Sequence, residues 1–122
     1  MNRTTEPSKT WFVDIDGVIF PHNGHLQLSN TEFEKPLPGV VEFFKSLNNQ
    51  DIVILCTARK ELYRNQTELS LKNAGIKYNL LIMGLSSGGR ILINDQKPDG
   101  KKTAYAINIV RNEGLKFIEM PE

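Results

Sequence analysis

The 122 residues suit one domain of ordinary size, which can bury a core without disulfides or a structural metal. A hydrophobic content of 39% and a charged content of 24% are typical of a globular protein, and a net charge of +1 predicts no bulk attraction to nucleic acid or to an anionic membrane. The single cysteine, Cys56, lies in the apolar stretch DIVILCTAR and is expected to be a buried small hydrophobe. No apolar run approaches the roughly 20 residues that span a bilayer, so we expect a cytoplasmic protein.

The N-terminal third predicts a flexible tail, a strand and a loop. Residues 1–9 are polar and predict the tail. Residues 10–15, TWFVDI, form a nearly continuous apolar run, which is typical of a strand buried on both faces. Residues 18–35 lack periodicity and contain proline, asparagine and glycine, so we expect a flap-like loop or small hairpin that is too short for a lid domain.

The middle of the chain alternates helix and strand signals. Residues 37–50 carry apolar side chains at helical spacing, and residues 51–56, DIVILC, predict a second buried strand. Thr57 is a candidate N-cap for a helix that reaches about Ala74, with Gly75 as its C-terminal stop.

The remaining apolar stretches complete the predicted sheet. Residues 78–83 and 90–95 predict two further strands, and residues 103–119 suit either a hairpin or a helix with an edge strand, of which strand character is favoured. This order predicts an α/β fold, a three-layer Rossmann-like sandwich with a mainly parallel central sheet and no large cap domain. Residues 1–122 would form this single domain.

Polar residues follow three of the predicted strands. Asp14 and Asp16 end the first, Thr57 ends the second, and Asn94 with Asp95 ends the last. The carboxyl ends of parallel strands meet at one edge of a sheet, where ligands bind, so we expect these side chains to converge. Carboxylates held together repel one another unless a cation or shared proton is present, and Mg²⁺ prefers such oxygen ligands together with phosphate and water.

These motifs resemble those of the haloacid-dehalogenase-like (HAD) superfamily of phosphohydrolases. DIDGV matches the first family motif, VILCTAR matches the second, and ILINDQKP matches the acidic motif with Asn94 in place of its first acid. The resemblance covers about residues 10–98. Because each motif follows an apolar strand, chance turns rich in Asp and Gly are the weaker explanation.

The resemblance implies a role for each matching residue. Asp14 would attack phosphorus and form an aspartyl-phosphate, and Asp16 would protonate the leaving oxygen and later deprotonate water. Mg²⁺ would be held by Asp14, the Asp16 carbonyl and Asp95. The implied phosphate ligands are Gly17, Thr57 and Ala58.

The chain departs from the family at the cation that usually precedes the acidic pair. Leu85 stands near the expected place of a lysine. Arg90 begins the predicted strand, and five strand residues at about 3.3 Å each would carry it toward the opposite edge of the sheet from Asp95. We therefore assign the catalytic cation to Lys97 and a substrate contact to Arg59.

The implied function is Mg²⁺-dependent hydrolysis of a small phosphorylated metabolite, such as a sugar phosphate. Without a lid the site would be open, either to a large substrate or to cover by a second subunit in a homo-oligomer. Phosphotransferase or mutase chemistry, a phospholigand-binding module and a phosphoacceptor signalling domain are the alternatives. His22 and His25 are interpreted as solvated loop residues.

Overall fold

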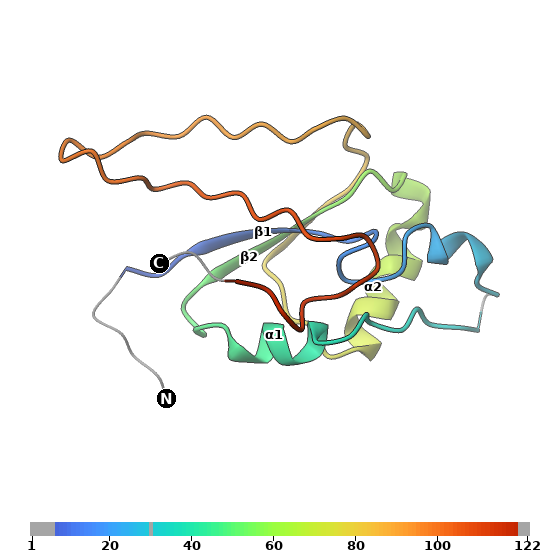
Figure 1. Cartoon of the computed structure of the whole chain (residues 1–122). Helices are drawn as coiled ribbons and strands as arrows, with labels where there is room; N and C mark the ends of the chain where they lie inside the picture. The colour runs from blue at the N-terminus through green and yellow to red at the C-terminus, as the bar shows by residue number, and fades with distance from the viewer. Residues whose placement is uncertain (1–6, 30, 120–122) are drawn as a thin grey trace.

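A parallel sheet of three strands organises the structure, a computed structural model that describes residues 7–29 and 31–119 (Figure 1). The strands β1 (Thr10–Asp14), β2 (Ile52–Cys56) and β3 (Leu80–Ile82) lie in the order β1-β2-β3. Asp14 pairs with Cys56 and Cys56 pairs with Ile82, so the three strands end at the same edge. The helical elements are η1 (Gly24–Gln27), α1 (Val40–Ser46), η2 (Glu61–Tyr63) and α2 (Arg64–Asn73).

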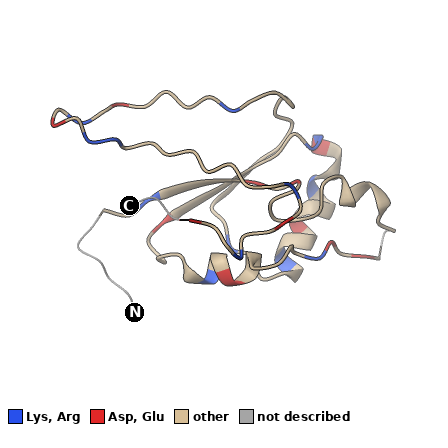
Figure 2. Ribbon diagram, in the orientation of Figure 1, with Lys and Arg blue, Asp and Glu red and all other residues tan. Residues whose placement is uncertain are grey.

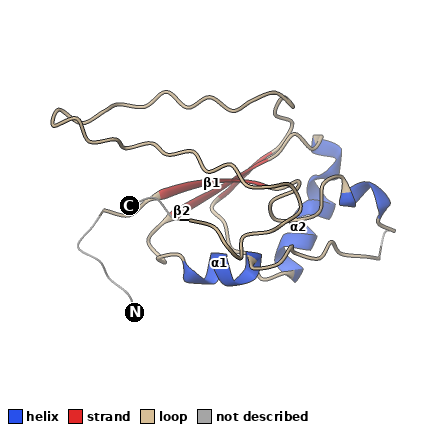
Figure 3. Ribbon diagram, in the orientation of Figure 1, coloured by secondary structure: helices blue, strands red, loops and turns tan. Residues whose placement is uncertain are grey.

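One face of the sheet packs against the two α-helices, which lie on the same side of it (Figure 3). Side chains that alternate along the strands point into this layer and are buried, because successive strand residues face opposite sides. The core residues from the sheet are Val13, Val53, Leu55 and Leu81, and those from the helices include Val40, Phe43 and Leu71. Gly75 follows α2 with φ 73° and ends the helix as predicted.

The opposite face of the sheet is open and apolar. Phe12 is 58% exposed, Ile52 44%, Leu80 56% and Ile82 39%. The expectation that the first strands are buried on both faces is therefore wrong for the part of the chain described, whereas the α/β class and the parallel sheet are confirmed. Apolar exposure of this kind is unusual, because parallel sheets in proteins normally have both faces covered.

Residues 86–108, here called the arm, leave the domain as two extended limbs joined by a turn (Figure 1). Their hydrogen bonds link the limbs to each other: Asn94 Nδ2 donates to Thr103 Oγ1 over 2.7 Å, and Lys97 N donates to the Lys101 carbonyl over 3.1 Å. Residues 90–95 form no strand, so the prediction of a fourth strand is wrong, and residues 103–119 contain no strand either. The apolar residues of 90–95 lie on a limb that has no hydrogen-bonded partner strand in the described part of the sheet.

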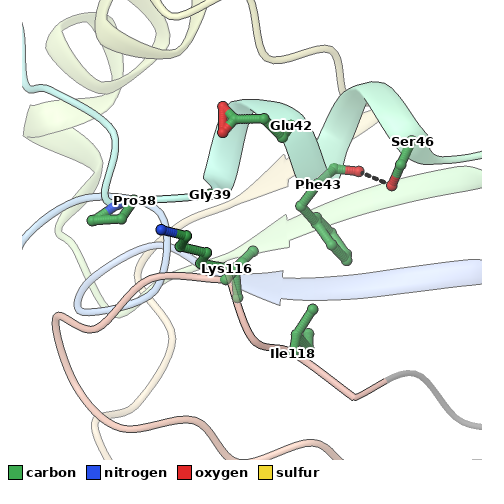
Figure 4. A pocket seen from close by; sticks show the side chains of 8 residues that line it. Pro38, Gly39, Glu42, Phe43, Ser46, Lys116 and Ile118 are labelled. Atoms are coloured by element: carbon green, nitrogen blue, oxygen red, sulfur yellow. Dashed lines mark hydrogen bonds between the residues drawn. The ribbon is translucent and has the colours of Figure 1, made fainter.

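Beyond the arm the chain returns to the domain. Leu115 is buried and its N–H donates to the Pro38 carbonyl over 2.9 Å, next to the start of α1. A Cβ on Gly39 would lie 2.5 Å from Lys116 N, so only glycine permits this approach. A pocket of about 550 Å³ remains between α1 and this segment, and Figure 4 shows Phe43 and Ile118 on its walls.

Two further expectations meet the structure only in part. Residues 18–35 form turns and the short helix η1 where described, in agreement with the predicted loop. Of the predicted tail 1–9, residues 1–6 lie outside the described residues. Within the described ranges no helix has the length and apolar character needed to cross a membrane.

Candidate functional site

The DIDG stretch turns sharply where β1 ends. Asp14 is the last residue of β1, and the carbonyl of Ile15 accepts hydrogen bonds from the N–H groups of Ile19 (2.9 Å) and Phe20 (3.1 Å). Gly17 adopts φ 80°, a conformation that L side chains rarely take, and its N–H donates to the Phe20 carbonyl. The turn therefore needs glycine directly after Asp16, and it presents both carboxylates at the edge of the sheet where the strands end.

A buried arginine lies at the centre of the site. Arg59 donates from Nη2 to Asp16 Oδ1 over 3.0 Å, and its Nε lies 3.1 Å from the same oxygen. From the other side it donates to both oxygens of Glu34, from Nη1 over 2.7 Å and from Nη2 over 2.8 Å. Nη1 also donates to Thr67 Oγ1 over 3.1 Å. One guanidinium thus joins the β1 turn, the loop before α1 and helix α2.

The burial of this cluster decides its protonation and its importance. The side chains of Arg59 and Glu34 are 0% and 2% exposed, and that of Asp16 is 16% exposed. Burial acts to lower the pKa of Arg59, but its hydrogen bonds to Glu34 and Asp16 raise the pKa overall, so the guanidinium stays charged. Removing one member of such a buried group leaves an unpaired charge, which typically costs about 3–5 kcal/mol.

Arg59 does not fit its predicted role as a substrate ligand. Its side chain is fully buried, and each of its three nitrogen atoms donates to protein oxygens. Arg59 instead fixes the carboxylate of Asp16. The sequence places arginine at the correct edge of the sheet but does not indicate that it turns inward.

Thr57 supports the same carboxylate from β2. It directly follows the strand, is fully buried, and donates from Oγ1 to Asp16 Oδ2 over 3.1 Å. Its Oγ1 also accepts a hydrogen bond from the Arg59 N–H over 3.0 Å, so it caps a local turn. The prediction that Thr57 caps α2 is wrong, because α2 begins at Arg64. Ala58 lies exposed beside it.

Asp14 differs from Asp16 in being exposed to solvent. Its Oδ1 accepts a hydrogen bond from the Ile15 N–H over 2.9 Å. Partial burial raises the pKa of Asp14, and the nearby Asp16 charge adds to this, while the Ile15 hydrogen bond and the charge of Arg90 oppose it. The two carboxylates therefore have different surroundings, one accessible and the other held by donors.

His25 borders the cluster from η1. Its Nδ1 lies 3.7 Å from Asp16 Oδ1, and its ring packs edge-on against Tyr63. The residue is 7% exposed, so the interpretation of His25 as a solvated loop residue is wrong. Burial lowers its pKa, and the charge of Arg59 lowers it further, which keeps the imidazole neutral near pH 7.

Asp95 and Lys97 are placed away from this centre, on the arm. Asp95 is exposed and its carbonyl accepts a hydrogen bond from Thr103 Oγ1, while Lys97 lies at the turn between the limbs. Arg90, at the base of the arm, acts electrostatically on Asp14 and on Cys56. The side-chain convergence expected at the sheet edge is therefore seen for Asp14, Asp16 and Thr57 but not for Asp95.

The described residues do not assemble the ligand set that Mg²⁺ would need. Over residues 7–29 and 31–119, no group of three or more His, Cys, Asp or Glu side chains is placed to hold a metal ion. Asp14 and the backbone of the β1 turn supply oxygens, but Asp95 on the arm does not join them. This arrangement accordingly lacks the third ligand predicted from the sequence.

Three residues of the site were not anticipated from the sequence. Glu34 lies in an irregular loop and Thr67 on the buried face of α2, and neither stands in a sequence pattern that marks a functional position. Asn112 belongs to the turn-like RNEG stretch; its N–H donates to the Gly17 carbonyl over 2.9 Å and its Oδ1 accepts from His22 N over 2.8 Å. The returning chain thus braces the DIDG turn.

Comparison with known proteins adds no assignment. No family model, curated protein or solved structure matches the chain. The chemistry of the site has to be argued from the residues themselves.

The raised pKa of Asp14 predicts a pH-dependent effect of Asp14→Asn on stability. A carboxyl group whose pKa is raised on folding stabilises the fold below its unfolded pKa, and that stabilisation is lost as the pH rises through the folded pKa. Asparagine does not ionise, so the variant avoids the unfavourable charge that Asp14 carries at pH 7. The melting temperature of the variant minus that of wild type should therefore be larger at pH 7 than below about pH 3.8, which is the ordinary pKa of Asp.

Thermal melts of both proteins across this range measure the difference, and Asp99→Asn at the exposed tip of the arm controls for loss of one negative charge. A relative stability of Asp14→Asn that is greater in acid than at pH 7 would contradict the assignment.

Proposed function

We propose that the protein is a phosphomonoester hydrolase of the HAD type that acts through an aspartyl-phosphate on Asp14. The observation that supports the proposal is that two carboxylates with different surroundings, the exposed Asp14 and the hydrogen-bonded Asp16, lie side by side where β1 ends. Asp14 is open to a substrate, whereas Asp16, two residues later, is held by Arg59 and Thr57. Two-step phosphoryl transfer needs these two functions in adjacent groups.

The proposed reaction proceeds in two displacements. An Asp14 oxygen attacks phosphorus while the bond to the leaving oxygen breaks, and Asp16, which holds the proton taken from water in the preceding turnover, gives that proton to the leaving oxygen. Water then attacks the phosphorus of the aspartyl-phosphate, Asp16 takes a proton from it, and the bond to Asp14 breaks to release inorganic phosphate. Ala58 is exposed at the same edge, and its backbone would face the phosphate oxygens. Thr57 is fully buried and gives its hydroxyl proton to Asp16, so the predicted phosphate contact of Thr57 is replaced by a role in holding that carboxylate.

Dependence on Mg²⁺ is part of the proposal and requires a rearrangement of the arm. Asp95 must reach the end of β1, and residues 90–95 must leave the position described above. β1 is an edge strand with an unpaired side, and the sheet face beside it is apolar and open. Ile91 and Ile93 on the arm are 89% and 92% exposed, so docking would bury apolar surface on both partners.

The finer fold class depends on the same movement. If the arm covers the open face, the sheet lies between two layers, as the three-layer sandwich expected from the sequence requires, but the second covering layer is extended chain and not helix. Four of the six charged residues of the arm lie near its tip and would stay in water, which favours this orientation (Figure 2). Lys97, Asp99, Lys101 and Lys102 make up this group.

The substrate class and the setting complete the proposal. A small phosphorylated metabolite, such as a sugar phosphate, is the proposed substrate. Residues 18–29 and 31–35 form turns and the short helix η1, so the site stays open unless a second copy of the chain covers it. Nucleic acid and membranes are not proposed as partners, given a net charge of +1. A cytoplasmic location is proposed on the basis of the single, unpaired Cys56.

Phosphate release tests the activity directly. Purified protein incubated with Mg²⁺ and a panel of sugar phosphates should release inorganic phosphate, and Asp14→Asn should lower the rate on the order of 10³-fold or more because the nucleophile is lost. Glu42→Gln, an exposed carboxylate on α1, is the matched control and should retain the wild-type rate. Wild-type protein that releases no phosphate yet is stabilised by the same compounds would instead be a phospholigand-binding module.

Hydrogen exchange tests the docking of the arm. If the arm covers the sheet, the amides of Ile91, Leu92 and Ile93 should exchange at least about tenfold more slowly than those of Asp99 and Lys102 near the tip, because only the former become buried. The measurement is mass spectrometry of peptides from the two parts of the arm. Equal, fast exchange along the whole arm would refute docking and the third layer with it.

A further inference from the structure

The carboxylate of Asp16 is oriented by a chain of buried contacts that ends at Glu34. Glu34 is 4% exposed, and its two oxygens occupy one side of the Arg59 guanidinium while Asp16 occupies another. The guanidinium is planar and its donors have fixed directions, so fixing one edge fixes the other. The position of Asp16 is thereby linked to a residue 18 positions along the chain, in a different loop.

Glu34 is itself anchored to α2. Its N–H donates to Ser70 Oγ over 3.1 Å, and Ser70 is fully buried. Thr67, one turn earlier on the same helix, accepts a hydrogen bond from Arg59 Nη1. The helix therefore holds both the arginine and its second carboxylate, although the loop that carries Glu34 has no regular structure of its own.

Stability alone is a poor reason for this arrangement. Two carboxylates and one guanidinium are withdrawn from water, and replacing a buried ionic group of this kind by apolar side chains of similar size is often neutral or stabilising. The geometric consequence is more specific, because both oxygens of Asp16 accept hydrogen bonds from fixed donors on Thr57 and Arg59. A residue that must meet first a leaving oxygen and then a water gains from such a fixed position.

We infer that Glu34 and Thr67 are positioning residues for Asp16, acting through Arg59. This inference rests on the proposed phosphatase function. Neither residue contacts the reacting atoms; each holds the guanidinium so that its remaining edge orients the Asp16 carboxylate next to Asp14. Loss of either residue should impair the proton transfers assigned to Asp16 more than the attack by Asp14.

The test separates the two chemical steps with p-nitrophenyl phosphate, whose phenolate leaves without a proton from the enzyme. Attack by Asp14 then appears as a burst of one nitrophenolate per active site, and the steady-state rate reports hydrolysis of the aspartyl-phosphate, which needs Asp16 as base. The variants are Glu34→Gln and Thr67→Val. The second preserves side-chain shape and the charges of the cluster, so it keeps the test valid if the first fails to fold. Glu61→Gln, an exposed partner of Arg64, is the control.

We expect Glu34→Gln to lower the steady-state rate by about 10- to 100-fold and Thr67→Val by about 3- to 10-fold, which is less than the roughly 10²- to 10⁴-fold that a positioned acid–base group contributes, because Asp16 itself stays in place. The burst amplitude should persist, and phosphoenzyme should accumulate in both variants. Two results would overturn the inference. One is a burst amplitude and a steady-state rate that fall together in proportion to the folded fraction. The other is wild-type kinetics in folded Thr67→Val and Glu34→Gln. Wild-type protein with neither burst nor turnover would instead refute the proposed function on which the inference rests.

Discussion

The paired ionic contacts of Arg59 are the constraint on which the rest of the site depends. A guanidinium that is fully buried must find anionic partners, because an unpaired charge in the interior is strongly unfavourable. Asp16 from the β1 turn and Glu34 from the next loop supply them. The hydrogen bonds of Arg59 hold two loops and α2 together at the edge of the sheet. They engage Asp16, so Asp14 is the accessible carboxylate of the DIDG turn.

Sequence patterns were sufficient for the three strands of the sheet, helix α1, the end of α2 and the position of the DIDG turn. β1 and β2 are short apolar runs, α1 shows helical spacing, and Gly75 ends α2, so local physical rules apply directly. The meeting of Asp16 and Thr57 also followed from the sequence, because parallel neighbouring strands end at one edge. These features depend on contacts that are either local or fixed by the sheet.

The remaining features depend on long-range choices that no local pattern encodes. Nothing in the sequence around Glu34 distinguishes it from other loop glutamates. Its role depends on the ion pair with Arg59, which lies 25 residues later in the chain. Residues 90–95 have the composition of a buried strand, but a strand also needs a partner, and in the structure the limbs of the arm hydrogen-bond to each other. The open face of the sheet and the arm both expose apolar side chains to water, and each has surface that the other could bury.

In the proposed reaction Asp14 accepts a phosphoryl group at the edge of the sheet, next to the Asp16 carboxylate that Arg59 holds. This step is tested most directly by acid quenching during turnover of a sugar phosphate, followed by proteolysis and mass spectrometry. The peptide containing Asp14 should gain the mass of one phosphoryl group, and Asp14→Asn should abolish this modification. Continued phosphate release with no modified Asp14, or a phosphoryl group on another residue, would contradict this step.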